Sequence, residues 1–176
     1  MSVVNRFALL CLSLSLSACS IQSSQPDVKL PRDGNWVMLP LVNYSQAPQA
    51  GERAEQILYT LLAKQGLSAA PYPATNNQDM PLLDDGERLQ QALQWAKQRG
   101  ANYAVSGSVD EWQYKSGLDG EPAVGITLKV IEPSSGRILW SGSAARAGWS
   151  RESLAGAGQR VLDTLVNDLP IDRIDE

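Results

Sequence analysis

The first half of the chain alternates between two hydrophobic periods. Residues 35–44, which include Trp36, form a mostly apolar run that predicts a buried strand ending near its proline. Residues 51–64 instead place apolar side chains three and four positions apart, which predicts an amphipathic helix that Gly66 can end. Residues 67–72 predict a second short strand. Because a helix joins two short strands, we expect a βαβ unit whose strands pair in parallel.

The second half begins with a polar loop over 71–81 and then returns to the helical period. Asp84 or Asp85 can cap this second helix, and Gly100 can end it. Alternation of apolar and polar residues then predicts an antiparallel meander of three longer strands. These strands cover 101–114, 122–132 and 137–148.

The apolar phase changes inside the first strand of this meander. Val105 and Val109 share one face, whereas Trp112 and Tyr114 fall on the other, which predicts a bulge or a strand that leaves the core. Ser150 is predicted to cap a last amphipathic helix. The expected fold class is α/β (α+β): a single mixed β-sheet, built from a βαβ unit and an antiparallel three-stranded meander, flanked by helices.

The N-terminal segment carries a processing signal. Leu16-Ser17-Ala18-Cys19 follows Arg6 and an apolar, serine-rich run that is too short for a membrane-spanning helix. The tetrapeptide resembles the lipobox of bacterial lipoprotein precursors. That resemblance implies removal of the peptide before Cys19 and attachment of three acyl chains, palmitate among them, to the cysteine. The alternative is an ordinary secretory signal that ends near a cysteine.

The same resemblance implies a location and a domain plan. Ser20 rather than aspartate follows the cysteine, which in enteric-type sorting implies the outer membrane, with the body in the periplasm. We expect a lipoprotein signal peptide, a lipidated flexible tether, one α/β domain and an acidic tail. Their expected boundaries are 1–18, 19–34, 35–170 and 171–176.

Charge and missing residue types narrow the chemistry. The formal net charge is −4, which disfavours nucleic acid as a partner and is compatible with a cationic ligand. The chain has no histidine, Cys11 falls in the signal peptide and Cys19 would be acylated. Catalysis by Ser-His-Asp or Cys-His, disulfides and His/Cys zinc sites are therefore not expected. Because no nucleotide, dinucleotide or calcium motif occurs, we expect no cofactor, no metal and no enzymatic activity.

Several longer segments are more distinctive than any short motif. They are 36–43, 51–55, 111–125, 139–141 and 148–151. Together they resemble the PelC family, the outer-membrane lipoproteins that serve export of the Pel exopolysaccharide during biofilm matrix formation. The resemblance implies a twelve-subunit ring, without enzymatic activity, against the inner leaflet of the outer membrane. It also implies an acidic funnel that guides a partly deacetylated, cationic polysaccharide to the outer-membrane export barrel of the same system.

Four carboxylates near one predicted hairpin are candidates for that funnel. Asp119 and Glu121 flank its turn, and Asp110 and Glu111 lie near its base. Carboxylates repeated around a ring add their fields, so that weak single charges become a strong collective attraction for amines. The alternative is that Asp-Gly is an ordinary turn dipeptide and that these carboxylates are solvated.

Trp149 is the candidate for contact with lipid. It lies between a predicted strand and a predicted helix, beside Arg146 and Arg151. An aromatic side chain flanked by cations is typical of a surface that meets lipid headgroups. The alternative is a tryptophan that folds back on the core.

The remaining aromatic residues divide between core and contact. Trp36 and Trp140 lie within strand patterns and are expected in the core. Trp95 lies off the apolar stripe of its helix and indicates either a subunit contact or partial burial. Trp112 and Tyr114 are candidates for an interface or for a platform on which sugar rings stack.

Two further functions are considered beside the export role. A tethered activator or interaction partner of a periplasmic peptidoglycan synthase, which uses a related small α/β domain, would be a monomer that binds one enzyme domain. A pore-forming secretion lipoprotein would need long strands that alternate apolar and polar residues, and the turn region 117–121 is too short and too acidic for that.

Overall fold

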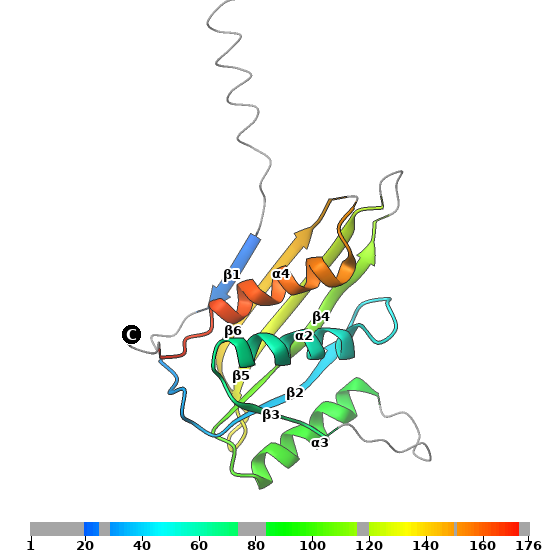
Figure 1. Cartoon of the computed structure of the whole chain (residues 1–176). Helices are drawn as coiled ribbons and strands as arrows, with labels where there is room; N and C mark the ends of the chain where they lie inside the picture. The colour runs from blue at the N-terminus through cyan, green and yellow to red at the C-terminus, as the bar shows by residue number, and fades with distance from the viewer. Residues whose placement is uncertain (1–19, 25–28, 74–83, 116–119, 150, 173–176) are drawn as a thin grey trace, which may run out of the picture.

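The described residues form six strands and three helices (Figure 1). The computed structural model describes residues 20–24, 29–73, 84–115, 120–149 and 151–172. In chain order the elements are β1 (Ser20–Ser24), β2 (Trp36–Asn43), α2 (Ala50–Lys64), β3 (Ala69–Pro71), α3 (Asp85–Gln98), β4 (Tyr103–Tyr114), β5 (Pro122–Glu132), β6 (Arg137–Ala147) and α4 (Leu154–Asn167).

The six strands make one mixed sheet in the order β1-β6-β5-β4-β2-β3. β2 pairs in parallel with β3 and with β4, while β4, β5 and β6 form an antiparallel meander. The predicted fold class, with its βαβ unit and three-stranded meander, is therefore confirmed. α2 and α4 lie together on one face of the sheet, and α3 covers part of the other face (Figure 1).

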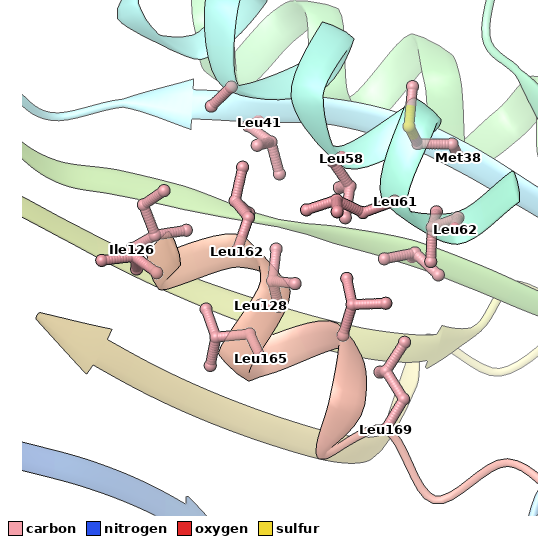
Figure 2. Close-up of a cluster of buried hydrophobic side chains, with 14 of the residues drawn as sticks. Met38, Leu41, Leu58, Leu61, Leu62, Ile126, Leu128, Leu162, Leu165 and Leu169 are labelled. Atoms are coloured by element: carbon pink, nitrogen blue, oxygen red, sulfur yellow. The ribbon is translucent and has the colours of Figure 1, made fainter. Parts of the chain in front are cut away.

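The main core lies between the sheet and the helix pair α2 and α4. Alternate residues of β5, from Val124 to Val130, are fully buried on this side. Figure 2 shows the leucine stripes of both helices meeting these strand residues, with Leu58 of α2 and Leu162 of α4 turned toward each other's side of the core. Each fully buried leucine contributes about 1.5–3 kcal/mol of transfer free energy, so the helical stripes read from the sequence account for much of this packing.

The core beneath α3 is smaller and is built from smaller side chains. Its buried residues are Val37, Leu39, Ala92, Ala96, Ala101 and Ala104. Asp84 caps α3 as predicted, because its side chain accepts a hydrogen bond from the Glu87 N–H at 2.8 Å.

Pro40 lies at an irregularity in the pairing of β2 with β4. The register shifts between Met38 and Leu41, where β2 carries one residue more than β4. The Ser106 hydroxyl, which is buried, donates a hydrogen bond to the Pro40 carbonyl oxygen at 2.9 Å. This bond satisfies a backbone acceptor at the bulge without help from water.

Two carboxylates complete the edge of β2 beyond the short strand β3. The backbone N–H of Leu41 donates to Glu55 Oε1 at 2.9 Å, and that of Asn43 donates to Asp85 Oδ2 at 2.7 Å. Arg88 in turn donates to both carboxylate oxygens of Glu55, at 3.3 and 3.0 Å. These bonds tie α2 and α3 to the same stretch of β2, a role for Glu55 that the sequence pattern did not reveal.

The start of the last helix differs from the prediction, and the bulge in β4 agrees with it. α4 is capped by Ser153, whose hydroxyl accepts a hydrogen bond from the Gly156 N–H at 3.0 Å. The predicted cap Ser150 lies outside the described residues. The register of β4 against β5 shifts between Val109 and Glu111, which confirms a bulge at the predicted phase change.

The segment predicted to be a flexible tether, 19–34, contains regular structure. β1 runs antiparallel to β6, from Ser20 opposite Ala145 to Ser24 opposite Ser141. Leu30 is 2% exposed, and its N–H donates to the Pro170 carbonyl oxygen at 2.7 Å. The prediction is therefore wrong for these residues, because pairing at a sheet edge uses backbone groups and needs no apolar pattern.

Candidate functional site

The candidate surface lies at one end of the sheet, which we call the hairpin end. It comprises the described residues 112–115, 120–122, 147–149, 151 and 152. β4 and β6 end here and β5 begins here, at the upper side of the view in Figure 1. Two backbone bonds brace it: the Lys115 N–H donates to the Glu121 carbonyl oxygen at 2.8 Å, and the Gly148 N–H to that of Pro122 at 2.7 Å.

Trp149 projects from the hairpin end into solvent. Its side chain is 78% exposed, so the alternative of a tryptophan folded back on the core is wrong. Tyr114 is 52% exposed on the same end, and its hydroxyl accepts a hydrogen bond from the Leu154 N–H at 3.3 Å. Both aromatic side chains are therefore placed on a braced backbone and are accessible. Contact of Trp149 with lipid remains a prediction.

Glu152 organises the cations beside Trp149. Its carboxylate lies 3.3 Å from Arg146 Nη2 and 3.0 Å from Arg160 Nε, and its side chain is only 13% exposed. Its backbone N–H donates to the Trp149 carbonyl oxygen at 2.8 Å. The predicted lipid-contacting pair of cations is therefore unequal, because Arg146 is engaged by Glu152 whereas Arg151 is exposed.

Gly148 is the residue whose identity in the sequence reflects this arrangement, because only glycine lacks the side chain that would collide there. A Cβ atom at this position would lie 2.4 Å from Glu152 Oε2 and 2.7 Å from Pro122 Cγ. Glycine therefore allows the loop to pass close enough for Glu152 to reach its cations. Sequence reasoning missed Glu152 because its partners lie on β6 and α4, which the sequence alone does not bring together.

Asp110 and Glu111 lie at the bulge of β4, away from the turn of the hairpin. The two oxygens of Asp110 accept hydrogen bonds from the Ser108 hydroxyl at 2.7 Å and from the Thr127 hydroxyl at 2.8 Å. Glu111 Oε1 accepts one from Gln113 Nε2 at 3.0 Å. These carboxylates are thus held by neighbouring polar side chains on the sheet face that α2 and α4 leave free.

Glu121 is the candidate carboxylate that the structure places at the hairpin end, where it is exposed. Asp119, its predicted companion, lies outside the described residues, as does the predicted lipidation residue Cys19. The three described candidate carboxylates are therefore divided: Asp110 and Glu111 lie together on the sheet face, and Glu121 lies at the hairpin end.

Trp112 does not serve as a platform for sugar rings or an exposed interface. It is 2% exposed and packs under α4, where a Cβ atom on Gly158 would lie 2.3 Å from its Cη2. The bulge turns it back into the core, and the missing side chain at Gly158 makes room for its ring. Trp36 and Trp140, at 2% and 1% exposed, are core residues as predicted.

Trp95 is partly buried, which agrees with one of its two predicted roles. Its ring meets Tyr72 edge to face at a centroid distance of 5.5 Å, and the Arg99 guanidinium lies 5.0 Å from the ring centre. These contacts fix α3 against the end of β3.

A groove at the opposite end of the molecule was not anticipated from the sequence. It encloses about 530 Å³ between the C-terminal ends of α2 and α4. Arg32 donates to the carbonyl oxygens of Gln65 and, at 3.2 Å, of Asp172, and Lys64 pairs with Asp163 at 3.5 Å. Arg32 therefore satisfies a backbone carbonyl at the C-terminal end of α2, and the ion pair links α2 to α4.

Glu132, in the turn between β5 and β6 away from the hairpin end, has a carboxyl group whose pKa is lowered from its ordinary value. A hydrogen bond from the Ser135 hydroxyl is the main cause that lowers its pKa, and Arg137 at 3.5 Å lowers it further. The shift belongs to a local turn and does not reach the hairpin end.

Within the described ranges, no helix is long and apolar enough to cross a membrane. Nor do three or more carboxylate, cysteine or histidine side chains of those ranges gather as a metal ion would require.

Solved structures resemble this chain over most of its length. A single-substitution variant of PelC from Paraburkholderia phytofirmans, a dodecamer, is 30% identical with a TM-score of 0.71, and the match covers 89% of this chain and 99% of that one. The PelC dodecamer from the same organism in another crystal form gives 30% identity, a TM-score of 0.70 and coverage of 88% and 99%. The chain belongs to the PelC family.

Membership of the PelC family confirms the resemblance read from the longer sequence segments. A lipoprotein from Neisseria meningitidis shares the fold, at 17% identity and a TM-score of 0.54, over 76% of this chain and 95% of that one. Neither a family model nor a curated protein matches the chain.

Proposed function

We propose that this PelC-family protein is an outer-membrane lipoprotein that assembles into a ring and guides a cationic exopolysaccharide to its export barrel. The observation that carries the proposal is the 30% identity to a PelC that is a dodecamer, in a match that covers 89% of this chain and 99% of that one. Twelve copies around an axis would form a corridor on the periplasmic side of the outer membrane. The protein would act without a cofactor and without catalysis.

The attraction for the polymer is electrostatic and arises from repetition. The monomer carries a formal charge of only −4, and single exposed carboxylates bind amines weakly in water. A ring repeats Glu121 and Asp119 in every subunit, so their fields add in a confined opening. Many weak contacts hold a moving polymer without stalling it, since no single site binds it tightly.

Attachment to the membrane combines a lipid anchor with surface contacts. Acyl chains on Cys19 would supply most of the affinity, at about 0.8 kcal/mol per buried CH₂ group. The exposed Trp149 and Arg151 would then contact headgroups of the inner leaflet. This seating would point the ring opening toward the export barrel.

Binding to polymers of matched length tests the proposal. The mature lipidated protein in detergent should bind a partly deacetylated amino-sugar polymer about tenfold more tightly than its fully acetylated counterpart at low salt. The difference should shrink at moderate salt, because screening weakens a diffuse attraction. Isothermal titration or sedimentation with the polymer measures both affinities.

A variant that carries both Asp119→Asn and Glu121→Gln should remove most of this preference, whereas Asp163→Asn on α4 should leave it. Equal affinity for the two polymers at both salt concentrations would contradict the proposal. A one-to-one complex with a periplasmic peptidoglycan synthase domain, formed by a monomer, would instead support the activator function.

A further inference from the structure

We propose that β1 clamps the lipid attachment point against the sheet, so that the hairpin end meets the lipid surface at close range. The inference rests on the lipid anchor of the proposed function, and it needs neither a ring nor a polymer. Ser20, the first residue of β1, follows the predicted lipidation residue Cys19 directly and pairs with Ala145 of β6. Trp149 comes two residues after the end of β6.

The antiparallel direction of β1 determines at which end of the sheet the lipidated residue lies. Because β1 runs against β6, its first residue lies toward the end of the sheet where β6 ends, which is the hairpin end (Figure 1). The covalent link from the acylated residue therefore enters the structure on the side from which Trp149 projects.

The next fixed point of the chain lies at the other end of the molecule. Leu30 is buried there beside the segment that follows α4, where it forms a bridge with Ile171. The Asp172 N–H also donates to the Leu30 carbonyl oxygen at 3.1 Å. If β1 were released, the lipid would hang from Leu30, at the end of the molecule opposite to Trp149.

The length of chain involved decides how much the clamp matters. A flexible segment of the eleven residues from Cys19 to Lys29 has a root-mean-square span of about 18 Å, from about 5–6 Å times the square root of its length. When β1 pairs with β6, the residues of β1 are fixed along β6 and no longer extend the reach of the tether. The hairpin end is then held at a higher effective concentration near the lipid surface, and Trp149 insertion becomes an intramolecular step. The fixed position of Leu30 lowers the entropy cost of pairing β1 with β6, because the chain between β1 and Leu30 is short.

Disulfide formation tests the register directly. Residues that face each other in an antiparallel pair have Cα atoms about 4.5–5.5 Å apart, within the range that a disulfide spans. The full chain with Gln22→Cys and Ser143→Cys should therefore cross-link after lipidation. The control with Gln22→Cys and Ala147→Cys places the second cysteine about 13 Å out of register and should not. Competing thiols are not expected, since Cys11 is removed and Cys19 is acylated.

Trp149 fluorescence then reports the seating. The lipidated chain is placed in vesicles of phosphatidylethanolamine and phosphatidylglycerol that contain brominated acyl chains, which quench tryptophan near the bilayer. Ile21→Pro combined with Gln22→Pro removes the N–H that faces β6 whichever of the two residues donates it. This variant should lower the quenching of Trp149 at least twofold. Ile21→Val with Gln22→Thr keeps strand-favouring residues and should retain it. A Trp149→Phe variant identifies the signal.

Two outcomes would overturn the inference: no cross-link between positions 22 and 143, or unchanged quenching in the proline variant. A cross-link together with reduced quenching supports it, even if the same preparation is monomeric or fails to bind polymer. In that case the export role alone would be wrong.

Discussion

Exchange of Asp119 for lysine is expected to lower polymer export at least about tenfold while the subunit stays folded and assembled. Each subunit changes by two charge units, and assembly repeats this change around the opening, so that the corridor begins to repel amines instead of attracting them. The measurement is the amount of matrix polymer outside cells in which the variant replaces the natural protein. Circular dichroism of the purified variant checks the fold.

The matched control is Asp172→Lys, which makes the same change in charge near the far end of the molecule, where Asp172 is exposed. We expect export by this control to stay near that of the natural protein. If Asp119→Lys exports normally, Asp119 does not act on the polymer, and the attraction has to be assigned to other carboxylates. If both variants fail equally, total charge matters and not its position.

Gly107→Ala is expected to cost about 4 kcal/mol or more in the free energy of unfolding, enough to unfold a marginally stable domain. Gly107 lies in β4, and a Cβ atom built there would lie 1.9 Å from the Thr127 carbonyl oxygen and 3.0 Å from the Leu128 Cα. Both atoms belong to the backbone of β5, so neither can turn aside as a flexible side chain would. Two paired strands of the meander would have to separate.

Gly125→Ala provides the comparison within the same pair of strands. Its added Cβ would meet the Glu111 Cβ at 3.5 Å, which is an ordinary van der Waals contact. We expect its stability to change by less than about 1 kcal/mol. Urea unfolding followed by circular dichroism measures both variants. A small effect of Gly107→Ala would show that β4 and β5 are less closely spaced than described.

The elements that hydrophobic spacing can reveal were predicted closely. The stripe of α2 and the alternation in β5 both face the main core, because their side chains are selected by burial. Strand β1 escaped prediction, since Ser20–Ser24 pairs through its backbone and shows no alternation in its sequence. The phase change in β4 allowed either a bulge or a strand that leaves the core, and the bulge after Val109 turns Trp112 into the core instead of toward a partner or a sugar ring.

The candidate site could be predicted only in outline. Trp149 was predicted from its position between a strand and a helix and from the arginines on either side, and its exposure agrees with that prediction. The engagement of Arg146 by Glu152 could not be read in this way, because the carboxylate reaches back across a turn that only the folded loop creates. Glu55 was likewise hidden, since its acceptor role depends on where β3 stops along β2.

Native mass spectrometry of the mature lipidated chain tests most directly whether several subunits enclose an anionic passage. The mass is measured in detergent and in lipid nanodiscs, at low and at moderate salt. We expect a particle of twelve copies, as found for PelC from Paraburkholderia phytofirmans, that persists at least in lipid. A single copy in every one of these conditions would contradict it, because one subunit alone cannot enclose a passage for the polymer.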